Sequence, residues 1–194
     1  RALLLIQLSA YGLYQITHQD QAGFADQRLS LADIDSPLDA ALRDAVYAAE
    51  TANDLANACD TILHRRMERQ VVSDALLLAT TAISAHHGQL QVKEVARLAG
   101  YSERHLGRLF LAQVGVNIKS YARLTRFAYV LEHMQASPCF LATLSQKAGY
   151  FDQPHFDKDF KAISGVTPQV YLEKMSGFYY DGMEALNTLS SKEG

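Results

Sequence analysis

The chain has 194 residues, 48% of them hydrophobic, which is enough to fill one large core or two small ones. It has no run of 18 apolar residues, and Gln7, Ser9 and Gly12 interrupt its apolar start, so neither a membrane span nor a signal peptide is expected. The net charge is −3, yet residues 71–176 carry 11 basic and 8 acidic side chains, a net of +3 that permits a polyanionic partner.

The N-terminal part of the chain contains the one segment that we predict to be a strand. Leu3–Leu8 is a short apolar run of the length expected for a buried strand. The chain starts at Arg1 rather than Met, which is typical of a fragment or a processed product.

Start and stop signals predict three helices after this strand. Ser36 is expected to cap the first, with Pro37 at its first helical position, and the helix to run to about Glu50. The motif "TAND" at 51–54 repeats the start signal for the second helix. The third is expected over roughly 71–86, with an end at the following glycine, Gly88.

The two cysteines of the chain and the adjacent pair His86 and His87 do not form a metal-binding pattern. Cys59 and Cys139 lie outside any ligand spacing, and we interpret them as reduced, mostly buried thiols of an intracellular protein. His86 and His87 are adjacent, so on a helix they point about 100° apart. No metal and no cofactor are therefore expected.

Two stretches in the second half of the chain are similar to each other. Ala99-Gly100-Tyr101 recurs as Ala148-Gly149-Tyr150 at an offset of 49. After one inserted residue, the apolar and glycine positions recur at an offset of 50: Leu106, Phe110, Gly115, Val116 and Tyr121 return as Phe156, Phe160, Gly165, Val166 and Tyr171.

Each copy has the pattern of two helices joined by a glycine turn. Gly100 and Gly149 provide the positive φ that a tight reversal needs, and Ser102 and Asp152 are good N-caps for the helix that follows. Before each turn, residues of one helix face recur at helical spacing. They are Val92, Val95, Ala96 and Ala99 in the first copy and Leu141, Leu144, Ser145 and Ala148 in the second, all apolar except Ser145. This is a helix-turn-helix pattern, so we interpret the repeat as two DNA-reading modules in tandem.

Residues 118–136 between the modules are predicted to form one long helix. Its expected apolar stripe consists of Leu124, Phe127, Ala128, Leu131 and Met134. Nineteen residues at about 1.5 Å each span roughly 30 Å, close to the ~34 Å of one DNA turn, which allows two recognition helices to enter successive major grooves. A solenoid needs at least three repeats. The predicted fold is therefore mainly α, with two tandem helix-turn-helix subdomains joined by a long helix and preceded by a small helical region.

Residues 75–174 resemble the AraC/XylS-type transcriptional regulators, a bacterial family with homeodomain-like modules. The motifs "GYSERHLGRLFLAQVGVNIKSY" and "AGYFDQPHFDKDFKAISGVTPQVY" carry the resemblance, and the second is the more specific. The chain departs from the family pattern at Gly107, where a longer polar side chain often reads bases, and at Ser145, where alanine is usual.

The resemblance implies a domain organisation and a set of partners. Residues 1–70 are expected to be the end of a sensor domain with its helical linker, 71–176 the DNA-binding domain and 177–194 a C-terminal tail. The implied partners are double-stranded DNA, RNA polymerase and a second copy of the chain, held through the N-terminal region or a part outside this sequence. The implied location is the cytoplasm, without membrane contact.

On the first recognition helix we expect Arg104 and Arg108 to contact bases, because a guanidinium group binds the O6 and N7 atoms of guanine with two hydrogen bonds. Ser102 is expected to cap the helix and also to lie near a phosphate. Lys119 is a candidate for phosphate contact at the start of the joining helix, and so is Arg126 further along it. For these two, an intramolecular salt bridge is an equally good interpretation.

On the second recognition helix we expect Gln153, His155 and Lys158 to contact bases and Lys161 to contact a phosphate, with a phosphate contact as the open alternative for Lys158. Asp157 and Asp159 repel phosphate, so this module is expected to read sequence more weakly.

The sequence therefore favours a sequence-specific DNA-binding transcription regulator without catalysis. The alternative is a regulatory protein–protein interaction module with only residual DNA affinity. An enzyme ranks third, because the sequence contains no nucleophile–base constellation, phosphate-binding glycine loop or paired carboxylates.

Overall fold

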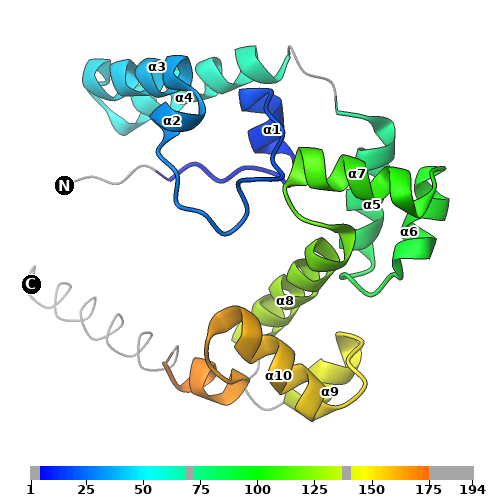
Figure 1. Cartoon of the computed structure of the whole chain (residues 1–194). Coiled ribbons are helices and arrows are strands. Elements are labelled where there is room, and N and C mark those ends of the chain that lie inside the picture. The colour runs from blue at the N-terminus through cyan, green and yellow to red at the C-terminus, as the bar shows by residue number, and fades with distance from the viewer. Residues whose placement is uncertain (1–4, 69–71, 137–140, 175–194) are drawn as a thin grey trace, which may run out of the picture. The chain divides into compact units, whose positions relative to one another are not determined.

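The computed structural model describes residues 5–68, 72–136 and 141–174, and in these ranges every regular element is a helix (Figure 1). This confirms the predicted mainly α fold. The elements are α1 (Gly12–Thr17), α2 (Leu31–Ile34), α3 (Ser36–Ala48), α4 (Ala52–Met67), α5 (Asp74–Ala85), α6 (Val92–Ala99), α7 (Glu103–Val114), α8 (Ile118–Ala136), α9 (Leu141–Lys147) and α10 (Gln153–Ser164). Residues 168–174 are also helical.

The chain divides into two compact units. The first unit consists of Arg1–His86 and Leu90–Ala122, and the second of His87–Gln89 and Arg123–Gly194. Helix α8 contributes its first turn to the first unit and the rest to the second. The first unit thus combines the N-terminal helices with the first helix-turn-helix, while the assignment of separate sensor, DNA-binding and tail segments stays a prediction.

The predicted strand does not form in the described part of its range. Residues 5–8 have no regular structure, and the Leu5 side chain is 83% exposed. Leu3 and Leu4 lie outside the described residues. A strand needs a neighbouring strand to pair its backbone groups, and the described ranges offer none.

The helix starts were predicted to within one to three residues. Helix α3 begins at Ser36, but the neighbouring Asp35 is its cap and accepts a hydrogen bond from the Leu38 N–H at 2.9 Å. At α4 the expected start is confirmed as a capping box between Thr51 and Asp54. Helix α5 begins only at Asp74 because Ser73 caps it. At all three starts a short oxygen-bearing side chain satisfies backbone N–H groups that the helix leaves unpaired.

The core of the first unit joins α5, α6 and α7 to the first turn of α8. Its buried side chains come from all four helices, and the large ones include Leu76, Ile83, Val95, Leu106, Phe110 and Ile118. Cys59 is a free, buried thiol in α4, as expected, whereas Cys139 lies outside the described residues.

The core of the second unit corrects the predicted stripe on the long helix. Val130 and Met134 are buried and Phe127 and Leu131 pack against them, but Leu124 is 46% exposed and Ala128 is also exposed. Residues two apart on a helix point to nearly opposite sides, so burial of Val130 turns Ala128 outward. Helix α8 has enough apolar residues to bury either of two faces, and packing against α9 and α10 determines which face is buried.

Candidate nucleic-acid interface

The first helix-turn-helix has the predicted turn and cap. Gly100 ends α6 with a φ of 73°, and the Tyr101 N–H donates to the Ala96 carbonyl oxygen at 3.0 Å. Ser102 then caps α7, accepting a hydrogen bond from the His105 N–H at 3.3 Å. The side chain of Ser102 is therefore engaged in capping.

The second helix-turn-helix repeats this geometry. Gly149 has a φ of 78°, and the Tyr150 N–H donates to the Ser145 carbonyl oxygen at 3.0 Å. Asp152 caps α10 by accepting from the His155 N–H at 2.8 Å. The inserted residue, Phe151, lies in the turn with its side chain 92% exposed. The two copies thus share the local structure that the repeat predicted.

The same positions are buried in both modules. Val95, Ala96 and Ala99 of α6 correspond to Leu144, Ser145 and Ala148 at α9, and Leu106 and Phe110 of α7 correspond to Phe156 and Phe160 of α10. Since one face of each second helix is buried, the opposite face of each remains exposed. That exposed face is the candidate interface.

Gly149 is held by a residue from the loop between α5 and α6. The Gln89 Nε2 donates to the Lys147 carbonyl oxygen at 2.8 Å, at the end of α9. A Cβ atom on Gly149 would lie 2.9 Å from the Gln89 Oε1 and would displace this exposed side chain, but it is the φ of 78° that requires glycine.

The predicted base-contacting residues of α7 are exposed, and one of them has a partner that sequence reasoning missed. Arg104 and Arg108 are both exposed. The Arg108 Nη2 lies 3.4 Å from the His105 Nδ1, and the His105 ring stacks on Tyr101 with centroids 4.7 Å apart and planes 17° apart. The spacing of three residues between His105 and Arg108 on a helix was the available signal.

The predicted contact residues of α10 are exposed too. These are Gln153, His155, Lys158 and Lys161. Asp157 is half-buried on the same helix, and burial raises the pKa of its carboxyl group.

Asp159 does not present the free charge that the sequence indicated. Its Oδ1 accepts a hydrogen bond from the Arg123 Nε at 2.5 Å, and its Oδ2 accepts one from the Tyr150 hydroxyl at 2.9 Å. Burial and this hydrogen bond raise the pKa of Tyr150 above its ordinary value. Because Arg123 opposes the carboxylate charge, Asp159 repels a phosphate less than expected and instead ties α10 to α8.

The two candidate phosphate contacts on α8 differ in their surroundings. Lys119 is exposed. Arg126 is half-buried, its Nη2 donates to the Gly88 carbonyl oxygen at 2.8 Å, and its guanidinium carbon lies 5.2 Å from the centre of the Tyr150 ring. Arg126 thus has intramolecular partners, although they are a carbonyl and an aromatic ring rather than a carboxylate.

The histidine pair is also engaged within the protein. The His86 Nδ1 lies 2.9 Å from the Ala82 carbonyl oxygen, and His87 stacks on Tyr129 at 4.2 Å. Among the described residues there is no cluster of three or more potential metal ligands. No helix in the described ranges is both long enough and apolar enough to cross a membrane.

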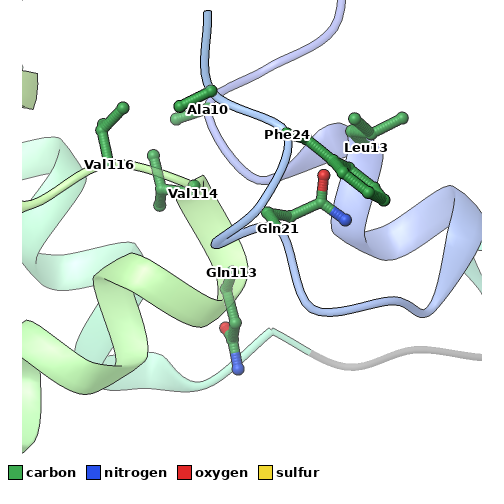
Figure 2. Close-up of a pocket in the computed structure, with 9 residues that line it drawn as sticks. Ala10, Leu13, Gln21, Phe24, Gln113, Val114 and Val116 are labelled. Atoms are coloured by element: carbon green, nitrogen blue, oxygen red, sulfur yellow. The ribbon is translucent and has the colours of Figure 1, made fainter. Parts of the chain in front are cut away.

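The N-terminal segment contacts the end of α7. The Gln21 N–H donates to the Ala112 carbonyl oxygen at 2.8 Å, and the Gln21 side chain is buried. A pocket of about 150 Å³ lies beside this contact, between Leu13 and Phe24 on one side and Val116 on the other (Figure 2). The position of α7 is therefore fixed partly by residues outside the helix-turn-helix.

Comparisons with known proteins agree with this geometry. Residues 95–174 match a family of helix-turn-helix domains. The transcriptional activator AarP of Providencia stuartii is 24% identical over 115 residues, which cover 59% of this chain and 83% of AarP. The regulator GlxA of Rhizobium meliloti (strain 1021) and the activator RhaR of Salmonella arizonae are each 34% identical, over 74 and 67 residues. Residues 95–174 therefore form a helix-turn-helix domain, and their similarity to these regulators supports the AraC/XylS-type resemblance.

A solved structure supports the fold of this helix-turn-helix domain. The C-terminal domain of AraT, a response regulator from Geobacillus stearothermophilus, superposes with a TM-score of 0.51 at 22% identity, covering 54% of this chain and 88% of that one. The matches to GlxA and RhaR cover 38% and 34% of this chain, and only 23% and 24% of those proteins. The likeness to them is therefore confined to a domain of each.

Proposed function

We propose that this chain is a sequence-specific DNA-binding transcription regulator without catalytic activity, in which α7 and α10 are the recognition helices. The similarity to AarP, GlxA and RhaR, which are helix-turn-helix-type transcriptional activators or regulators, supports this function. In a helix-turn-helix, the second helix lies in the major groove and its N-terminal residues reach the base edges.

The observation that carries the proposal is the repeated pairing of a left-handed glycine turn with a capped helix whose outer face carries exposed basic side chains. In both modules the buried face is fixed by two large apolar residues, so the same side of each helix faces outward. The first turn of each helix also has backbone N–H groups that favour an anion such as phosphate.

The residues have distinct proposed roles. Base contacts are assigned to Arg104 and Arg108 on α7 and to Gln153, His155 and Lys158 on α10, which are all exposed. Phosphate contacts are assigned to Ser102, Lys119, Arg126 and Lys161. Of these, Lys119 and Lys161 are exposed. Ser102 caps α7 and Arg126 binds the Gly88 carbonyl oxygen, so these two residues would contact a phosphate either in addition to those partners or in place of them.

The proposal extends to geometry and partners. Helix α8 has 19 residues, a length of roughly 28 Å at about 1.5 Å per residue, which is compatible with recognition helices in successive major grooves. RNA polymerase is the proposed protein partner, a homodimer through the N-terminal region is the proposed assembly, and the cytoplasm is the proposed location. Footprinting on a selected site tests the groove spacing, because two protected segments about one helical turn apart are expected.

A mobility-shift experiment tests the function itself. The protein is mixed with sheared, labelled genomic DNA, and unlabelled non-specific DNA is then added in excess. A set of fragments that stays bound in the excess of competitor is expected, and sequencing these fragments gives the preferred site. Uniform loss of all fragments would instead support the alternative of a protein–protein interaction module with residual DNA affinity.

A further inference from the structure

We infer that His105 is a positioning residue that holds the Arg108 guanidinium for base reading by the first module. The inference rests on the proposed function, since it requires that Arg108 contacts a base. It assigns to His105 a part in sequence preference without placing His105 itself on the DNA.

The His105 ring is held by stacking on Tyr101. Tyr101 follows the glycine turn directly, and its backbone N–H is bonded to α6 at 3.0 Å, so the base of the tyrosine side chain is anchored. The two rings are nearly parallel, with planes 17° apart and centroids 4.7 Å apart. At the other end, the His105 N–H is bonded to the Ser102 cap. The imidazole is therefore constrained by both its ring face and its backbone.

A hydrogen bond from Arg108 requires one tautomer of the histidine. A guanidinium group has only donors, so the Nδ1 atom, 3.4 Å away, has to be the accepting nitrogen, as it is when Nε2 carries the proton. A free arginine side chain loses considerable rotamer entropy when it is fixed on a base. A neighbour that restricts the side chain before binding lowers that cost.

The second module lacks this arrangement. His155 occupies the corresponding place on α10, but it meets Tyr150 edge-on, with planes 80° apart and centroids 5.4 Å apart. Among the described residues, no hydrogen bond joins its ring to Lys158, the counterpart of Arg108. The pairing is thus a feature of α7 and not a general consequence of the repeat, and His155 provides a matched control.

The test uses four single variants and one double variant, Arg108→Ala with His105→Phe, all of the whole chain and all measured on the selected DNA site and on each single-base variant of it. His105→Phe keeps a ring to stack on Tyr101 but removes the acceptor. His105→Gln keeps a carbonyl acceptor but removes the ring. His155→Phe is the control in the second module, and Arg108→Ala identifies the base pair that Arg108 reads. Circular dichroism melting confirms that each variant is folded.

We expect His105→Phe to reduce the preference at the Arg108 base pair by about three- to tenfold, the effect of losing one hydrogen bond, and to leave the other positions unchanged. His105→Gln should retain more of that preference than His105→Phe. His155→Phe, at a residue that is itself assigned a base contact, should change the preference only at positions read by the second module and leave the Arg108 base pair unaffected. In the Arg108→Ala background, His105→Phe should have no further effect.

Three results would overturn the inference: an unchanged profile for His105→Phe, an equal loss at every position, or a loss that adds to that of Arg108→Ala. If Arg108→Ala flattens one position while His105→Phe flattens none, only the positioning role is wrong. If the wild-type chain has no sequence preference at all, the proposed function is wrong as well.

Discussion

Arg66 at the end of α4 holds both carboxylate oxygens of Asp35, with its Nη1 at 2.5 Å from Oδ2 and its Nη2 at 3.2 Å from Oδ1. The same carboxylate caps α3 through the Leu38 N–H. One side chain thus starts one helix and fastens the end of another.

This pair predicts a loss of stability at low pH. Burial raises the pKa of Asp35, but the hydrogen bonds from Arg66 and the Leu38 N–H outweigh it and hold the pKa below its usual value. The pair therefore stabilises the fold above the unfolded pKa of about 3.9, and this contribution is lost as the pH falls through the lower folded value.

The substitution Asp35→Asn keeps an oxygen cap but removes the charge. It should lower the free energy of unfolding by about 1–3 kcal/mol at pH 7, because Arg66 is left without its partner. Urea denaturation at pH 7 and pH 3 measures the difference, which should shrink at pH 3. An equal difference at both values would mean that the charge contributes nothing.

Two glycines with the same backbone angle predict how much the contact with the N-terminal segment contributes. Gly115 and Gly165 each have a φ of 81°. A Cβ on Gly115 would lie 2.9 Å from the Gln21 carbonyl oxygen, whereas a Cβ on Gly165 meets nothing within 4 Å. Gly165→Ala should therefore cost about 1–2 kcal/mol, the penalty of the left-handed conformation alone.

Gly115→Ala should cost about 1–3 kcal/mol more than its counterpart, because Gln21 must also move. Chemical denaturation of both variants measures the difference. Equal losses of unfolding free energy in the two variants would show that the segment around Gln21 moves aside without destabilising the fold.

The corrected stripe on α8 predicts which substitutions reach the second core. Met134 is 2% exposed, so Met134→Ala should lower the free energy of unfolding by about 2–5 kcal/mol. Leu131 is only half-buried, and Leu131→Ala should cost less than Met134→Ala. Leu124→Ala, on the exposed side, should change stability by about 0.5 kcal/mol or less. If denaturant titrations give the largest loss for Leu124→Ala and the smallest for Met134→Ala, the buried face of α8 is the one predicted from sequence.

The two recognition helices are expected to differ in how they bind. Arg108→Ala should cost about 1–3 kcal/mol on the selected site and relax the preference at one base pair. Lys158→Ala, if Lys158 mainly meets phosphate, should weaken binding to all sequences alike and lower the salt slope by about one unit. Titrations on single-base variants across a salt series distinguish the two patterns. If Lys158→Ala loses base preference while Arg108→Ala retains it, Lys158 is the residue that contacts a base and Arg108 the one that contacts phosphate.

The repeat was predictable because its signals are local. A glycine at a left-handed position, an N-cap two or three residues later and apolar residues at helical spacing all act within about ten residues, and each was found where the sequence placed it. The choice of Asp35 rather than Ser36 as a cap was not predictable in this way, because two adjacent residues both suit the position.

Contacts between distant residues explain what sequence reasoning missed. Asp159 looked like a free negative charge, but its partner Arg123 is 36 residues away, and only the packing of α10 on α8 brings the two together. The buried face of α8 likewise depends on α9 and α10. The Leu3–Leu8 strand required a pairing partner that a short apolar run does not specify.

The three residues His87–Gln89 have a consequence for how the protein can be divided. They lie in the chain between α5 and α6, yet they belong to the second unit, where Gln89 binds the last turn of α9 and Gly88 accepts from Arg126. A fragment cut from α8 onward would lack both partners and would leave the half-buried Arg126 guanidinium without its carbonyl. The two copies are similar in sequence, but the second depends on residues outside it. A chimaera that exchanges the second module must therefore also include His87–Gln89.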